Sequence, residues 1–141
     1  MIVVDTNVTV YLYIRNLYSE EVKRLLRVDS EWVVPQLWRF EFRNSLMQYV
    51  RHQNMPLSDS LLLIEKAEER FDGRVGETSY TEVMALASRS QCSAYDCEFV
   101  ALARKNDVKL VTYDKRVLQE FPEIALRPLE YIDQLNNEEN A

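Results

Sequence analysis

Two acidic side chains follow short apolar runs at places where an acid is unusual. Asp5 comes directly after the run Ile2-Val3-Val4, and Asp114 follows the segment KLVTY. Short apolar runs of this kind are typical of buried strands in a parallel sheet. Because the carboxyl ends of parallel strands meet at one edge of the sheet, the two carboxylates are expected at the same edge.

Two further acids border the apolar faces of predicted helices. Glu41 lies in QLWRFEFRNSL, beside Trp38 on a helical projection. Asp96 lies in SAYDCEFVALA and continues the stripe of Phe99 and Val100, which are three and four positions further on. An acid on such a face is not a simple solvated residue, so both are candidates for a buried or partly buried site.

Each acid also has a purely structural interpretation. Asp5 and Asp114 could cap the helices that follow them, and Asp96 stands three residues after Ser93, where a capping box places its acid. Glu41 could pair with a neighbouring arginine or extend into solvent. Taken one at a time, these alternatives are about as good as a functional interpretation, but four acids at one place are harder to explain in this way.

Bringing the four carboxylates together requires compensation of their charge. Two like charges 4 Å apart repel by about 4 kcal/mol at an effective dielectric constant of 20. Protons or a hard divalent cation that prefers oxygen ligands, Mg²⁺ or Mn²⁺, would relieve this repulsion. The chain offers no plausible general-base histidine and no obvious serine or cysteine nucleophile system, so water activated by such a cation is the simplest nucleophile.

The composition limits the other possibilities. The 141 residues suit a single domain, and the only glycines, Gly73 and Gly76, exclude a phosphate-binding P-loop and a Rossmann fingerprint. Cys92 and Cys97 have a spacing typical of neither a zinc knuckle nor a redox motif, and we expect both to be reduced. The net charge of −6 disfavours nucleic-acid binding unless the acids are concentrated and neutralised. With no membrane-length apolar run and no signal-peptide pattern, the expected location is cytoplasmic.

Short apolar segments alternate with helical patterns along the chain, which predicts an α/β sandwich around a parallel sheet. We expect a domain over residues 1–135 and a frayed polar tail over 136–141. The predicted strands are 2–4, 32–34, 74–75, 109–112 and 124–126, and the predicted helices are 8–15, from 19, 36–52, 58 to about 72, 79–90, 93–105 and 115–120.

Four segments, IVVDTNV, FEFRNSL, AYDCEFVALA and LVTYDKRVL, resemble the PIN-domain nucleases, and particularly the VapC-type toxins of bacterial VapBC toxin–antitoxin pairs. The resemblance covers about residues 2–118 in order, although 53–90 contribute little. Asn106-Asp107 replaces a glycine often found before the fourth segment, with the asparagine suited to a left-handed cap conformation.

The resemblance implies a PIN-like three-layer sandwich, with a parallel sheet of about five strands and helices on both faces. It also implies metal-dependent hydrolysis of single-stranded or looped RNA. Asp5 and Asp96 would be the principal metal ligands, while Asp114 and Glu41 would hold a second ion or metal-bound waters. The polar neighbours that orient these carboxylates would be Asn7 and Thr112.

Basic residues beside the acids are candidates for RNA binding: Arg39 and Arg43 beside Glu41, and Lys115 and Arg116 beside Asp114. Ordinary surface charge is the alternative explanation for each of them. As a toxin, the protein would be expected to form a homodimer and to bind a small antitoxin. Exposed residues of the early helices, such as Tyr11, Tyr13 and Leu17, are candidates for the antitoxin groove.

Four other functions are alternatives to a VapC-type toxin. A stand-alone RNA-processing PIN protein and a PIN-like module that binds RNA or protein without cutting are compatible with the same motifs, although intact acids disfavour the second. A haloacid-dehalogenase-like phosphatase needs a second aspartate two residues after the first, where this chain has Asn7. A receiver-type signalling domain needs paired acids and a late lysine that are not clearly present.

Overall fold

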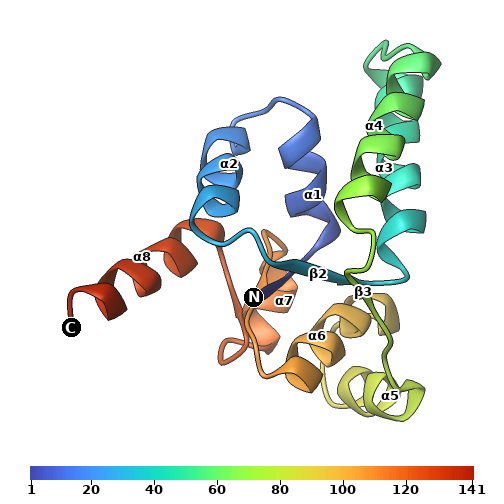
Figure 1. Ribbon diagram of the computed structural model, residues 1–141. Helices are drawn as coiled ribbons and strands as arrows, with labels where there is room; N and C mark the ends of the chain where they lie inside the picture. The colour runs from blue at the N-terminus through green and yellow to red at the C-terminus, as the bar shows by residue number, and fades with distance from the viewer.

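A five-stranded parallel sheet forms the centre of the molecule in the computed structural model, which describes all residues 1–141 (Figure 1). The strand order is β3-β2-β1-β4-β5, and every neighbouring pair is parallel. The predicted α/β fold with about five parallel strands is therefore confirmed. The strands are β1 Ile2–Val4, β2 Trp32–Pro35, β3 Val75–Gly76, β4 Leu110–Val111 and β5 Ala125–Leu126.

Eight helices cover the sheet. Figure 1 shows α1 to α4 on one side, α5 to α7 on the other, and α8 extending away beside α2. This division follows from the strand order, because right-handed crossovers in opposite directions along a sheet fall on opposite faces. The helices are α1 Thr6–Tyr13, α2 Ser19–Val28, α3 Trp38–His52, α4 Leu57–Arg70, α5 Tyr80–Ser88, α6 Ala94–Asn106, α7 Lys115–Glu120 and α8 Pro128–Glu139.

The central strand β1 is buried on both faces, with Ile2, Val3 and Val4 all at 0% exposure. Helix α6 packs against β1, β2 and β4 through an apolar face that includes Val100 and Ala103. A strand enclosed in this way cannot slide without exposing apolar surface, so the residue at its carboxyl end has a fixed place. No helix is long and apolar enough to cross a membrane.

The last helix extends into the expected polar tail. Residues 136–139 form the end of α8, and Asn140 and Ala141 follow it. Pro128 occupies the first turn, a position that suits proline, and Tyr131 and Ile132 are buried where α8 meets α2. Because these contacts fix the first two turns, each following residue adds a backbone hydrogen bond at little cost, despite its polar side chain.

The turn after α6 also differs in detail from the expectation. Asp107, and not Asn106, adopts the left-handed conformation, with φ 52° and ψ 47°. The Asn106 side chain instead donates a hydrogen bond from Nδ2 to the Leu102 carbonyl oxygen at 2.9 Å. Aspartate is one of the few residues besides glycine that visits this conformation, so the chain makes the turn without a glycine.

Candidate active site

Asp5 and Asp114 extend from the ends of neighbouring strands. Val4 of β1 is in register with Val111 of β4, and the Asp5 amide donates to the Val111 carbonyl oxygen at 3.0 Å. Thr112 joins the two acids, because its Oγ1 donates to Asp5 Oδ2 at 2.7 Å and accepts a hydrogen bond from the Asp114 amide at 3.0 Å. The strands thus bring these two acids to one edge of the sheet.

Asn7 holds Thr112 and the following residue in place. Asn7 Nδ2 donates to Thr112 Oγ1 at 3.4 Å, while Asn7 Oδ1 accepts from the Tyr113 amide at 3.2 Å. The first turn of α1 is therefore bonded to the segment that carries Asp114. Thr112 thus contacts Asp5 directly, whereas Asn7 is connected to Asp5 only through Thr112.

Glu41 reaches the same place from α3. Thr6 Oγ1 donates to Glu41 Oε1 at 2.8 Å, and the Thr6 amide donates to Asp5 Oδ1 at 2.8 Å. Thr6 is thus a link between two of the acids that the sequence analysis missed. The signal available was a hydroxyl residue directly after the acid at the strand end, on the first turn of the next helix.

Asp96 comes from the first turn of α6, where it forms a capping box with Ser93. The Asp96 amide donates to Ser93 Oγ at 3.0 Å, and the Ser93 amide donates to Asp96 Oδ2 at 3.3 Å. The Asp96 charge also acts on two other acids, since it helps to raise the pKa values of Asp5 and Glu41. Asp96 therefore has a capping role, and its charge also reaches Asp5 and Glu41.

Burial and mutual repulsion make Asp5 a weak acid. Loss of solvation is the largest cause that raises its pKa to about 7, and the charges of Glu41 and Asp96 add to it, whereas hydrogen bonds from Thr112 and Thr6 act in the opposite direction. Burial likewise raises the pKa of Glu41, with the Asp96 charge contributing and the Thr6 hydrogen bond opposing.

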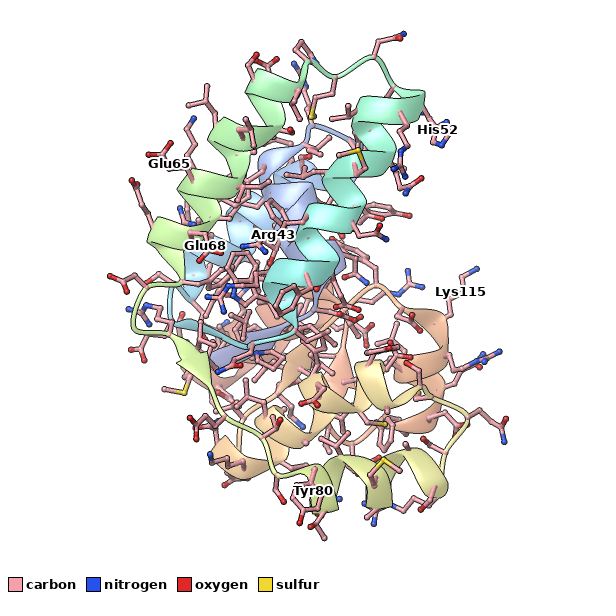
Figure 2. All side chains as sticks on the ribbon, turned by 90° about the vertical axis from the view of Figure 1, so that its right-hand side faces the viewer. Arg43, His52, Glu65, Glu68, Tyr80 and Lys115 are labelled. Atoms are coloured by element: carbon pink, nitrogen blue, oxygen red, sulfur yellow. The ribbon has the colours of Figure 1, made fainter.

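No basic side chain neutralises these acids. The ion pairs of the structure involve Asp29, Glu20, Glu68 and Glu82, and none includes a site acid. In the central region of Figure 2, oxygen atoms gather between α3 and the helices below it. The excess negative charge is the property that a bound cation would relieve.

The side chains as positioned do not form a complete metal site. No group of three or more His, Cys, Asp or Glu side chains is close enough to hold an ion. Capping explains part of this, because Asp114 Oδ1 accepts from the Arg116 and Val117 amides at 2.9 and 3.0 Å. The donors nevertheless fit a hard divalent cation in kind, since all are carboxylate oxygens with uncompensated charge. Binding would require some of these side chains to turn.

The basic residues predicted beside the acids divide into two groups. Arg39 and Arg43 pair with Glu68 of α4, at 3.1 and 3.8 Å, and Figure 2 shows Arg43 and Glu68 between α3 and α4. They are not brought to Glu41, because helix positions two apart do not face the same way.

Lys115 and Arg116, in contrast, are exposed on the first turn of α7, directly after Asp114. Figure 2 shows Lys115 extending from the molecule into solvent. Arg116 Nη1 donates to the Gln91 carbonyl oxygen at 3.4 Å. Of the basic residues predicted for RNA binding, only these two lie next to a site acid.

The chain is similar in sequence and in fold to several known proteins. Ribonuclease VapC3 of Pyrobaculum aerophilum is 29% identical over 128 residues, which is 88% of this chain and 97% of that protein. The structure of PAE2754 from the same organism superimposes with a TM-score of 0.76, at 18% identity and 96% coverage of both chains.

Two further solved structures share the fold. FitAcB from Neisseria gonorrhoeae gives a TM-score of 0.70 at 17% identity, covering 92% of this chain and 99% of its own. A toxin–antitoxin complex from Klebsiella pneumoniae gives 0.66 at 17% identity, covering 91% and 98%. The family model of the PIN domain matches residues 2–124, and the chain therefore belongs to the PIN-domain family.

Proposed function

We propose that this protein is an endoribonuclease that depends on Mg²⁺ or Mn²⁺ and acts as the toxin of a VapBC-type pair in the cytoplasm. The observation that carries the proposal is the linkage of three acids without a basic partner. Thr6 bonds to Asp5 and to Glu41, and Thr112 bonds to Asp5 and to Asp114. The raised pKa of Asp5, about 7, agrees with this uncompensated charge. The name of the relative Ribonuclease VapC3 and the Klebsiella toxin–antitoxin complex support the reaction and the toxin role.

The four acids have separate places in this proposal. Asp5 and Asp96 would be the main ligands of the cation, and Asp114 and Glu41 would complete its surroundings. When bound, such an ion lowers the pKa of water and neutralises charge on a phosphate group.

The neighbouring polar residues keep the acids in position. Thr6 and Thr112 each donate to one oxygen of Asp5, so that carboxylate is held in one orientation. Asn7 in turn fixes Thr112. Lys115 and Arg116 would attract the RNA phosphates toward the acids, because exposed cations next to an anionic site offset its repulsion of nucleic acid.

Replacing Asp96 with Asn tests the reaction directly. We expect the variant to keep its fold, since Asn can still accept the Ser93 amide hydrogen bond, and to lose RNA cleavage by about a hundredfold or more. The measurement is cleavage of a panel of structured RNAs with Mg²⁺, with Mn²⁺ and with a chelator.

Asp107→Asn is the matched control, because it makes the same change at the opposite end of the same helix and Asn tolerates the left-handed conformation. This variant should cleave like the wild type. Undiminished metal-dependent cleavage by Asp96→Asn would remove Asp96 from the mechanism, and cleavage by the wild type in excess chelator would remove the cation.

We further propose that the protein forms a homodimer and binds a small antitoxin. Among the residues considered for the antitoxin groove, Leu17 is 88% exposed, whereas Tyr11 packs against Tyr18 and Tyr113. Tyr13 also has a structural role, since its hydroxyl accepts from Arg70 Nε at 2.9 Å. Leu17 is therefore the best probe of an antitoxin surface. Co-purification with a small protein encoded upstream would separate a toxin from a stand-alone RNA-processing enzyme.

A further inference from the structure

Two cations stand at the same edge of the sheet as the site acids. Lys115 directly follows Asp114, and Arg127 directly follows β5, the strand next to β4. Both side chains line one hollow of about 420 Å³ between α7 and the start of α8, together with Gln119 and Glu130. This hollow is therefore a neighbour of the acids on the β5 side.

Both cations are available to a ligand. Neither Lys115 nor Arg127 takes part in an ion pair, and both residues are exposed. Glu130, the one acid in the hollow, accepts from the Arg127 backbone amide at 3.4 Å and forms no ion pair with either cation. In contrast, Arg104 pairs with Glu82 at 3.3 Å, so its charge is already compensated.

The opposite end of the same edge has the reverse charge. A hollow of about 310 Å³ at the carboxyl ends of β2 and β3 is lined by Glu77 and Glu98, with Gln36, Gly76 and Thr78, and by no cation. Lys105 lies close to this hollow, since its ammonium group donates to the Glu77 carbonyl oxygen at 2.8 Å, but it is not among the residues that line it. A polyanion at the acids thus meets cations toward β5 and further carboxylates toward β3.

We infer that Lys115 and Arg127 bind a phosphate of the RNA strand next to the cleaved bond, so that the strand leaves the acids over β5 and not over β3. The inference rests on the proposed function for the identity of the ligand. A guanidinium group matches the geometry of a phosphate and an ammonium group adds a mobile point charge. A flanking phosphate held here offsets the repulsion between the RNA and the site acids.

Binding of a short single-stranded RNA to the Asp96→Asn protein tests the subsite without cleavage. Adding Lys115→Gln and Arg127→Gln should weaken binding about tenfold, because two exposed charge pairs with the phosphate are lost. The slope of log affinity against log salt concentration should become less steep by about 0.7 for the lost phosphate contact.

The matched control adds Lys66→Gln and Arg74→Gln to Asp96→Asn. These residues line a hollow of about 540 Å³ near the amino ends of β2 and β3, are exposed, and form no ion pair. The control removes the same total charge away from the acids, so it should change affinity less than about twofold at a Debye length of about 8 Å.

A third variant examines the direction of the strand. Glu77→Gln removes repulsion on the β3 side, where no RNA is expected to pass, and should leave affinity within about twofold of the Asp96→Asn parent. Equal losses from the Lys115/Arg127 and Lys66/Arg74 pairs, a large gain from Glu77→Gln, or no RNA binding by the parent would each overturn the inference. If the wild type fails to cleave RNA while the binding pattern holds, the proposed function fails and the subsite stands.

Discussion

The Asp5 carboxylate combines two opposing effects within one side chain. Loss of solvation and negative neighbours raise its pKa, whereas hydrogen bonds from Thr6 and Thr112 favour its charged form. A buried carboxylate with fixed donors keeps its orientation even when its charge is unfavourable. The Asp5 carboxylate is therefore already ordered, as the proposed role of a cation ligand would require.

Thr112→Val tests whether the fixed orientation of Asp5 matters for stability and for cleavage. The change leaves Asp5 Oδ2 and the Asp114 amide without their partner, which should lower the free energy of unfolding by about 1–3 kcal/mol and cleavage by about 10- to 100-fold. Single-turnover cleavage and urea unfolding measure the two effects. Thr112→Ser keeps the hydroxyl group and serves as control, and a valine variant as active as that control would contradict the role.

The Cys92 thiol should be unreactive in the folded protein. Burial, helped by the negative charges of Asp96 and other neighbours, raises the pKa of the Cys92 thiol to about 11. Because the pKa is raised, the reactive thiolate is scarce below pH 11, and its fraction at pH 8 is about one in a thousand. Both cysteines are free, as expected.

Iodoacetamide labelling followed by mass spectrometry measures this reactivity. Labelling of Cys92 in the native protein at pH 8 should be at least about 100-fold slower than in guanidinium-unfolded protein, and it should rise about tenfold per pH unit. Rapid labelling of the native protein at pH 8 would show that the thiol is neither buried nor surrounded by negative charge.

At the scale of the elements, the site consists of helix starts placed at strand ends. Asp5, Asp96 and Asp114 are all N-cap or capping-box residues, so the structural interpretation of each acid is correct in detail. The structural interpretation is compatible with the functional interpretation, because a cap fixes a carboxylate at the start of a helix. The parallel sheet brings the starts of α1 and α7 to one edge. That the acids act in catalysis stays a prediction.

The turn after α6 offers a test at this scale. Asp107→Gly should raise the free energy of unfolding by about 0.5 kcal/mol, because glycine adopts φ 52° without the steric cost borne by a side chain. Asn106→Gly, one residue earlier, should lower the free energy of unfolding by about 1 kcal/mol. Asn106 is helical, and its side-chain amide donates to the Leu102 carbonyl oxygen. Urea unfolding of both variants compares them, and the same sign for both would contradict the assignment of the left-handed residue.

Elements with strong local signals could be predicted from the sequence. The β1 strand before Asp5, the Ser93 capping box of α6 and the extent of α7 agree with the expectation. Helix α8 was not predicted, although Pro128 is a helix-start signal, because its burial comes from Tyr131 and Ile132 packing in the folded molecule and its second half is polar.

Contacts between residues far apart in the sequence could not be predicted either. The partner of Arg39 is Glu68, which lies 29 residues away on α4, and local spacing carries no information about it. The same reason explains why the link from Thr6 to Glu41, between residues 35 positions apart, was missed.

At the scale of the molecule, Asp29 joins three separate parts of the chain. Its Oδ2 accepts from the Tyr131 hydroxyl of α8 at 2.7 Å and pairs with the Met1 amino group at 3.2 Å. The carboxylate follows α2, so this contact fastens α8 to the helix layer and to the start of β1. This contact holds the long C-terminal helix near its start, and Leu135 further along the helix also packs against the core.

Tyr131→Phe should remove one of these connections. Because the hydroxyl bonds to a charged group at low exposure, we expect the free energy of unfolding to fall by about 1.5 kcal/mol. Tyr80→Phe, at a residue with 84% exposure, is the control and should have no measurable effect. Chemical unfolding compares the two, and equal midpoints would show that the hydroxyl contributes nothing to the attachment of α8.

The spread of the four acids along the chain has a thermodynamic consequence. They come from positions 5, 41, 96 and 114, so an unfolded polypeptide presents only isolated, hydrated carboxylates. Under the proposed function, a divalent ion that binds these acids only in the folded protein would add RT ln(1 + [ion]/Kd) to the free energy of unfolding and so raise the melting temperature. The melting temperature measured over a range of magnesium concentrations would then give the affinity for the ion without any nucleic acid. In the Asp96→Asn variant, the melting temperature should depend less on magnesium concentration.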